Sequence, residues 1–240
     1  MNRLMWKNLL LCVCLTAPAP GADSRWSEID RLYLHRQEGK NLELSVEKLD
    51  DLIKAKADAP ALWRLGRGLV AVASAKQGKE EKVAAFKRAE APLRQAVKLA
   101  PGDAQAHYWL ARQMAGLNAE LRTLGLAKAM KKELEAALRA DPAHAASHRT
   151  YGELLRQLPG VFGGDKKKAI QETEEALRLS PNDTAAYPAL AEAYLDVKEK
   201  DKAVAALKKV FAVKDPADPA SCERDLEDAR AQLKKLGSAR

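Results

Sequence analysis

The sequence predicts an all-α protein, a right-handed α-solenoid of about five helical hairpins that ends in a C-terminal capping helix. The first of three observations behind this prediction is an internal repeat. Four prolines each follow an Ala-rich apolar segment and lie 41, 39 and 35 residues apart, at Pro101, Pro142, Pro181 and Pro216. Such a period is typical of stacked helical hairpins, each of which buries its apolar face against its neighbours.

The other two observations concern composition. Apolar residues make up 47% of the chain and aromatic residues only 5%, so the core must be built mainly from alanine and leucine. Alanine at a helix crossing lets two helices approach closely, as tightly packed hairpins require. Runs of β-branched residues are few and the Asn-Gly pair of tight β-hairpins is absent, so strands are not expected.

Residues 1–22 differ in composition from the rest of the chain. Arg3 and Lys7 are followed by a short apolar stretch (residues 9–15), and the small-residue segment TAPAPGA ends at Ala22. This layout predicts a secretory signal peptide that is cleaved near Ala22. The apolar stretch is too short to form a membrane-spanning helix. We therefore expect a periplasmic or secreted protein.

Two alternatives remain for this leader: lipidation at Cys12 or Cys14, and retention as an N-terminal anchor. Lipidation is disfavoured because Leu11 and Val13, which precede the two cysteines, are not small. Cleavage would leave Cys222 as the single cysteine of the mature chain, so no internal disulfide is expected.

Residues 23–217 form the expected repeat domain, in which equivalent positions recur on two helices of each unit. Steps of three, one and three residues, or of four and three, place each set on one helix face. The first-helix sets are Leu62, Leu65, Gly66 and Leu69; His107, Leu110, Ala111 and Met114; His148, Tyr151, Gly152 and Leu155; and Tyr187, Leu190, Ala191 and Tyr194. The second-helix sets are Ala89, Leu93 and Ala96; Met130, Leu134 and Ala137; Ala169, Thr173 and Ala176; and Ala203, Leu207 and Val210.

This pattern resembles the tetratricopeptide repeat, which has a bulky residue, then Leu-Gly or Leu-Ala, then Tyr, Ala, an apolar residue, Ala and Pro. The match is best over residues 185–216 and extends, with variation, over residues 26–216. The resemblance implies a scaffold that binds other molecules. A polar helix over residues 218–236, within a C-terminal cap and tail of residues 218–240, would shield the last repeat from water.

The segment LPGVFGGDKKKAI interrupts the fourth unit. We expect a glycine-rich loop after Pro159, with Phe162 folded onto the helices and Asp165 capping the next helix. Long hairpins with such a loop resemble a tetratricopeptide subgroup that includes the T-component of TRAP-type solute transporters and the regulators of microtubule dynamics.

The sequence contains no motif that supports catalysis or metal binding. His144 and His148 lie one helical turn apart, but no third ligand is near in sequence, so core or rim histidines are expected. Cys222 lies among charged residues with no histidine close by. We therefore predict a non-enzyme with no catalytic residue, metal site or cofactor.

The overall charge also limits the partners. The net charge is +8, and the 31% of residues that are charged have both signs interleaved. This is typical of solvated helix faces, so no nucleic-acid partner is expected.

Outside the leader no segment is long and apolar enough to cross a bilayer, so no transmembrane segment is expected in the mature chain.

One further set of residues is expected to face the concave side of the stack, where the first helix of each hairpin lies. Arginine forks hold carboxylates at two points, and aromatic rings offer flat apolar contacts. The set is Trp63, Arg67, Tyr108, Arg112, Arg149, Glu153 and Arg156. Alternatively, these arginines pair with Glu153 and other acids of the chain, which adds little to stability at an exposed surface.

The sequence therefore predicts a non-catalytic scaffold that binds an extended, acidic peptide or protein segment in a concave groove outside the cytoplasm. The resemblance to the TRAP T-component implies an alternative: an accessory component of extracytoplasmic organic-acid uptake that binds a small carboxylate. An oligomer with a shared cavity is compatible with this alternative.

Overall fold

The computed structural model describes residues 25–238, so the predicted signal peptide lies outside the described residues. These residues form eleven α-helices and two short 3-10 helices, with no strand among them. The helices are α1 (Ser27–Leu34), α2 (Asn41–Ala55), α3 (Ala59–Ala75), α4 (Lys79–Leu99), α5 (Ala104–Leu121), α6 (Leu124–Ala140), α7 (Ala145–Gln157), η1 (Gly160–Phe162), α8 (Lys166–Leu179), α9 (Ala186–Asp196), α10 (Lys200–Lys209), η2 (Val210–Ala212) and α11 (Pro219–Ser238).

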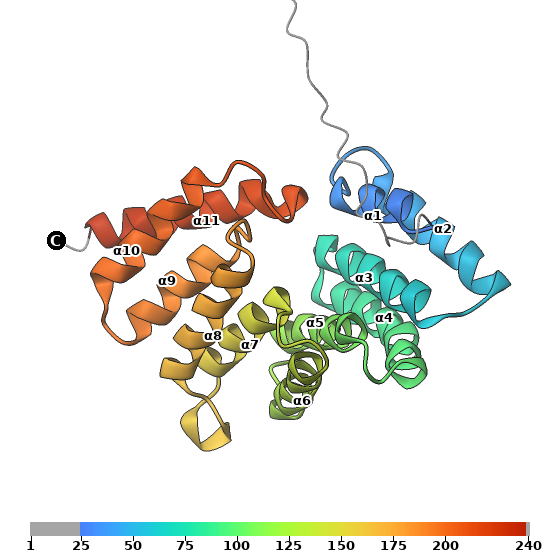
Figure 1. Ribbon diagram of the computed structural model, residues 1–240, viewed down its shortest axis with the longest axis horizontal. Helices are drawn as coiled ribbons and strands as arrows, with labels where there is room; N and C mark the ends of the chain where they lie inside the picture. Colours follow the sequence, from blue (N-terminus) through green and yellow to red (C-terminus); the bar gives the residue numbers. More distant parts are fainter. Residues whose placement is uncertain (1–24, 239–240) are drawn as a thin grey trace, which may run out of the picture.

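Consecutive helices pair as hairpins, from α1–α2 to α9–α10, and α11 packs on α9 and α10. The hairpins follow an arc in which α1, α3, α5, α7 and α9 lie on the inner side (Figure 1). The predicted all-α solenoid of five hairpins with a terminal helix is confirmed. Within the described range no helix is long and apolar enough to span a bilayer.

Small residues allow the two helices of a hairpin to approach closely. A Cβ atom on Gly152 of α7 would lie 2.4 Å from Oγ1 of Thr173 and 2.8 Å from the carbonyl oxygen of Ala169, both on α8. The equivalent positions of α5 and α9 hold Ala111 and Ala191, which are completely buried. The repeat register inferred from the sequence therefore places the small side chains at the crossings, where a larger one would separate the helices.

In three of the repeats, the bulky first position holds a polar ring that bonds to the carbonyl of the preceding proline turn. In α5, His107 Nδ1 lies 2.6 Å from Oε2 of Glu133, and its Nε2 lies 3.0 Å from the carbonyl oxygen of Pro101. Because a carboxylate and a carbonyl only accept hydrogen bonds, both ring nitrogens must donate, which requires the charged imidazolium. His107 is therefore a structural residue that joins the turn to helix α6.

The same arrangement recurs in the next two hairpins. His148 lies 2.6 Å from Glu172 and 2.9 Å from the carbonyl oxygen of Pro142. In α9, the hydroxyl of Tyr187 donates to the carbonyl of Pro181 at 2.8 Å. In three successive turns, a polar ring at the same repeat position thus donates a hydrogen bond to the carbonyl oxygen of the turn proline.

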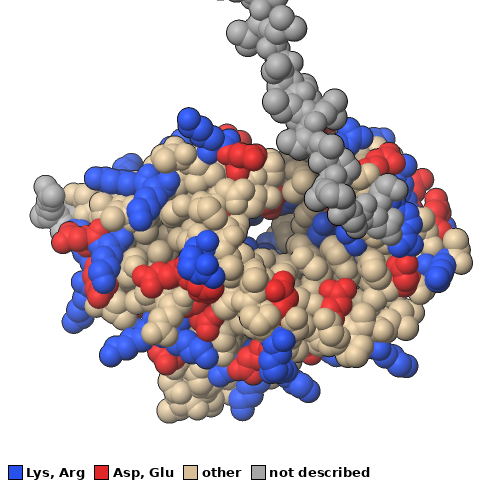
Figure 2. Space-filling model, viewed as in Figure 1, with Lys and Arg blue, Asp and Glu red and all other residues tan. Residues whose placement is uncertain are grey.

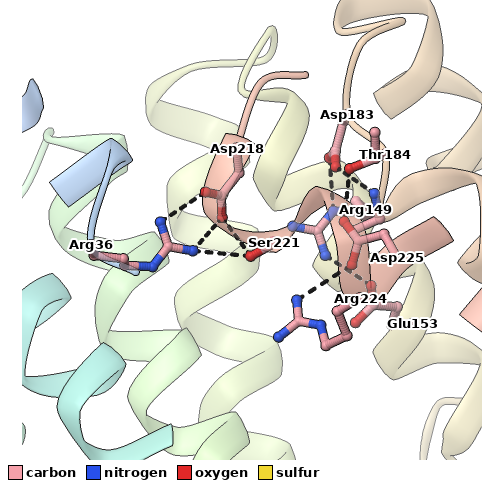
Figure 3. A network of polar contacts seen from close by, with 10 residues as sticks. Arg36, Arg149, Glu153, Asp183, Thr184, Asp218, Ser221, Arg224 and Asp225 are labelled. Atoms are coloured by element: carbon pink, nitrogen blue, oxygen red, sulfur yellow. Dashed lines mark hydrogen bonds and ion pairs between the residues drawn. The ribbon is translucent and has the colours of Figure 1, made fainter. Parts of the chain in front are cut away.

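The two ends of the solenoid meet. Arg36, which follows α1, donates to both carboxylate oxygens of Asp218 at 2.7 and 2.6 Å and to the hydroxyl of Ser221 at 2.9 Å (Figure 3). Burial raises the pKa of Asp218, but the hydrogen bond and the charge of Arg36 outweigh it and leave that pKa below its ordinary value. The arc therefore closes into a ring, and Figure 2 shows an opening near its middle.

The crossing at Gly152 gives a first prediction. Gly152→Leu should lower the free energy of unfolding by about 1–3 kcal/mol, because the branched side chain forces α7 away from α8. Gly125→Leu in α6 is the matched control, since a Cβ there meets nothing within 4 Å. Urea unfolding followed by circular dichroism measures both variants, and equal stability of Gly152→Leu and the wild type would contradict the packing described here.

A second prediction concerns pH. The hydrogen bond to Glu133 raises the pKa of His107 above its ordinary value of 6.5. Protonated His107 therefore stabilises the fold fully below pH 6.5, and this stabilisation is lost as the pH rises through the raised folded-state pKa. The stability difference between the wild type and His107→Ala should be larger at pH 6 than at pH 9.

The matched control for His107 is Tyr187→Phe, which removes an equivalent hydrogen bond through a group that does not titrate in this range. Its effect on unfolding should be the same at both pH values. A cost of His107→Ala that does not change with pH would show that the imidazole is neutral in the folded protein.

Candidate ligand-binding groove

The seven residues predicted for the concave side come from three inner helices. Trp63 and Arg67 lie on α3, and Tyr108 and Arg112 lie on α5. The remaining three lie on α7: Arg149, Glu153 and Arg156. The structure divides this set into residues that bind other parts of the chain and residues that line a groove.

Arg67 binds within the chain. Its Nη2 lies 2.6 Å from Oδ1 of Asp30 on α1, and Arg64 contacts the other oxygen of the same carboxylate at 3.0 Å. The Arg67 guanidinium lies 4.0 Å from the ring centroid of Tyr33 and 5.5 Å from that of Trp63, and only 9% of the residue is exposed. Burial raises the pKa of Asp30, but the two arginines outweigh it and hold that pKa below its ordinary value. Arg67 thus joins the first hairpin to the second.

Tyr108 belongs to an aromatic cluster on the inner wall. Its ring centroid lies 5.1 Å from that of Trp109 and 5.2 Å from that of His144, and Trp109 in turn lies 6.1 Å from Tyr33. The edge-to-face geometry of the Tyr and Trp rings stabilises such contacts. Tyr33 and Trp109 were not among the predicted groove residues, although aromatic residues beside predicted inner positions were a usable signal.

Arg149 and Arg156 also have intrachain partners. Arg149 lies 2.8 Å from Asp183 and 3.0 Å from Glu153 (Figure 3), and Arg156 lies 2.6 Å from Glu192 on α9. Although burial lowers the pKa of Arg149, the two carboxylates outweigh it and hold that pKa well above its ordinary value. These pairs fit the alternative interpretation, in which the arginines bind acids of the same chain. The bonds to Asp183 and Glu192 also join the fourth hairpin to the fifth.

Arg112 has a different environment. Within residues 25–238 its guanidinium makes no hydrogen bond and no ion pair, and it lies on the wall of a groove of about 720 Å³ between α5, α6 and α7. Arg122 also lines this groove, while Glu153, already paired with Arg149, lies on the α7 side. The walls are otherwise largely apolar, with contributions from Ala115, Leu124, Met130 and Leu154. The groove therefore offers two guanidinium groups beside an apolar surface.

Thr150 also belongs to the groove lining, but the residue is fully buried. Its Oγ1 has no hydrogen-bond partner in the described chain and lies beneath the groove surface. The exposed wall of the groove therefore offers positive charge and apolar contact.

The thiol of Cys222 is unsuited to nucleophilic catalysis. Burial, together with the nearby Asp225 and Asp218, raises the thiol pKa above its ordinary value, and a raised pKa reduces the reactive thiolate. Among residues 25–238, no group of three His, Cys, Asp or Glu side chains is placed to hold a metal ion.

Five helical hairpins, four of them with Gly or Ala at the crossing, define a helical-repeat protein of the tetratricopeptide type. The tetratricopeptide protein TTC0263 of Thermus thermophilus has a similar structure, with a TM-score of 0.61 and 19% identity over 85% of this chain and 98% of that one. The family model "Regulator of microtubule dynamics protein 1-3" matches residues 26–158, more than half of the chain. The chain belongs to this family.

Two structures of MamA are also similar to this chain. MamA from Desulfovibrio magneticus RS-1 has a TM-score of 0.49 and 18% identity, with 80% of this chain and 96% of that chain covered. Another MamA structure has a TM-score of 0.49 and 20% identity, with 78% and 88% covered. A search of curated proteins gave no match.

A third prediction follows from the difference between the arginines that pair with carboxylates of the chain and Arg112, which does not. Arg67→Ala should lower the free energy of unfolding by about 1–3 kcal/mol, because it removes a charged hydrogen bond to the half-buried Asp30. Arg94→Ala is the control, since the Arg94–Glu90 pair lies on an exposed face of α4 and should contribute little. Urea unfolding of both variants is the measurement, and similar losses would show that Arg67 is no more important to the fold than a surface arginine.

Proposed function

We propose that this protein is a non-catalytic scaffold that binds an extended, acidic peptide or protein segment in the groove between α5, α6 and α7. The observation that carries the proposal is Arg112, which lines the groove without a partner in the described chain. The other three predicted arginines are all paired with carboxylates, so Arg112 is the member of that set left to bind a ligand.

The chemistry of the groove favours a carboxylate-bearing segment with apolar side chains. Arg112 and Arg122 supply two positive charges, and Glu153 is bonded to Arg149, which it shares with Asp183. A guanidinium can hold a carboxylate through two parallel hydrogen bonds. Apolar side chains of the same segment would lie against Leu124, Met130 and neighbouring alanines. The volume of about 720 Å³ lies within the ordinary range of small-ligand sites.

The location outside the cytoplasm rests on the layout of residues 1–22 and belongs to this proposal. The small-carboxylate alternative, which the resemblance to the TRAP T-component implies, would use the same two arginines. A titration with succinate distinguishes it from peptide binding, because a small dicarboxylate gains the charge contacts but not the apolar ones.

The fourth prediction tests Arg112. An eight-residue peptide of alternating glutamate and leucine should bind the protein, and Arg112→Ala should weaken this binding by about 1–3 kcal/mol through loss of a charged hydrogen bond. Isothermal titration calorimetry is the measurement. Arg139→Ala, an exposed arginine near the other end of α6, should leave the affinity unchanged.

A second peptide with glutamine in place of glutamate is the uncharged control, and it should bind weakly to the wild type and to both variants. Equal affinities of the wild type and Arg112→Ala for the acidic peptide would contradict the proposed site. Tight binding of succinate together with weak peptide binding would support the small-carboxylate alternative instead.

A further inference from the structure

The connection between α7 and α8 projects from the outer edge of the ring (Figure 1, yellow). It carries two exposed apolar side chains: Val161 is 86% exposed and Phe162 is 43% exposed. The sequence pattern predicted that Phe162 folds onto the helices. It does lie at one end of the groove, but much of its ring remains at the surface. The tip of this loop is therefore apolar without being part of a core.

Backbone hydrogen bonds give the loop a defined shape. The carbonyl of Pro159 accepts from the amides of Phe162 and Gly164 at 2.9 and 3.1 Å, and the amide of Asp165 donates to the carbonyl of Leu155 at 3.0 Å. Gly163 has a φ of 85°, which favours glycine. These bonds hold Val161 away from the helices, so its exposure is a consequence of the loop conformation.

Two lysines of α6 contact this loop. The Nζ of Lys128 lies 6.0 Å from the ring centroid of Phe162, and the Nζ of Lys131 donates to the carbonyl of Gly163 at 3.3 Å. Lys132 lies one turn beyond Lys128 on α6, and Lys167 lies in the first turn of α8. None of these four lysines forms an ion pair within the described part of the chain.

A single carboxylate lies within the loop sequence, and it already has partners. Asp165 accepts hydrogen bonds from the backbone amides of Lys167 and Lys168 at 2.9 Å each, as the cap of α8. Asp165 therefore has backbone partners and does not pair with the lysines near the tip. In Figure 2 this tip forms the tan projection at the lower edge, with blue side chains, and some red ones, nearby.

We propose that this loop docks the protein onto an anionic membrane surface. Val161 and the exposed part of Phe162 enter the boundary between headgroups and acyl chains, while Lys128, Lys131 and Lys167 lie among the anionic headgroups. Apolar residues flanked by lysines bind membranes in this way, since burial of apolar area and attraction to anionic lipid act together. The flexible lysine stems let the ammonium groups reach headgroups at different positions.

A lipid surface fits this tip better than a protein does. Protein interfaces are depleted in lysine and enriched in arginine, tyrosine and tryptophan, whereas the cations around this tip are lysines. A stable protein interface also buries about 800 Å² on each partner, far more than two side chains on a projecting loop provide. A fluid bilayer needs no such matched surface.

This inference goes beyond the proposed groove. Val161 does not line the groove, and the family match ends at residue 158, before the loop begins. Changes at Val161 can therefore test membrane docking without altering the peptide site, whereas changes at Phe162 would affect both.

The experiment measures partition of the full chain onto vesicles by sedimentation at limiting lipid. One vesicle is pure phosphatidylcholine, and the other contains about one-third phosphatidylserine. The wild type should prefer the anionic vesicle. Val161→Asp and Lys128→Glu should each lower its partition coefficient on that vesicle by about fivefold or more. Leu99→Asp on α4 is the matched control, since Leu99 is also well exposed (53%) and should leave partition unchanged.

The apolar residues of the leader are present in every variant, so the ratio of partition coefficients reports on the loop. Equal partition of Val161→Asp, Leu99→Asp and the wild type would overturn the proposal, as would a wild type that does not prefer the anionic vesicle. If Val161→Asp partitions normally but no longer associates with a second protein or with its own copies, the loop is a protein interface and the proposal is also overturned.

Folding and the peptide site are checked separately. Circular dichroism should give the same helical signal and melting temperature for Val161→Asp as for the wild type. Its affinity for the glutamate–leucine peptide should also be unchanged. If Val161→Asp loses vesicle binding but still binds the peptide, the result supports docking by the loop. If it keeps vesicle binding but loses peptide binding, the result counts against docking, whether or not the groove is the peptide site.

Discussion

The fold depends on how closely the two helices of each hairpin can approach. Gly152 has no room for a Cβ against Thr173, and Gly66 has none against Leu93, whose Cγ would lie 2.3 Å away. In α5 and α9 alanine holds the same position, at Ala111 and Ala191. Because each hairpin packs on the next, this spacing fixes the separation of the inner helices. The positions of the inner side chains follow from it, and so does the width of the groove between α5 and α7.

Within that frame, charge has two distinct roles. Most inner arginines join one hairpin to another: Arg67 reaches back to α1, and Arg156 reaches forward to α9. They are largely buried and their partners are fixed, so they make the inner wall rigid. Arg112 lacks such a partner and lies at the groove. A rigid inner wall would present the proposed site already formed, which reduces the entropy that binding must overcome.

The parts of the structure that the sequence predicted are those that repeat. Leu93, Leu134 and Leu207 recur at one position of the second helix, and all three are fully buried. Ion pairs between hairpins, such as Arg67 with Asp30, could not be predicted in this way, because the two partners occupy positions whose pairing does not recur in the other repeats. The exposure of Phe162 was missed for a related reason: it depends on backbone hydrogen bonds within one irregular loop, which no periodic pattern encodes.

The contact of Arg36 with Asp218 changes how such an array should unfold. An open stack of repeats frays from its two ends, because each end unit has one neighbour instead of two. Here the first hairpin and the last helix are neighbours in space although 182 residues separate the bonded pair. Loss of either terminal element would deprive the other of a contact, so amide hydrogens in α1 and α11 should exchange as one cooperative unit.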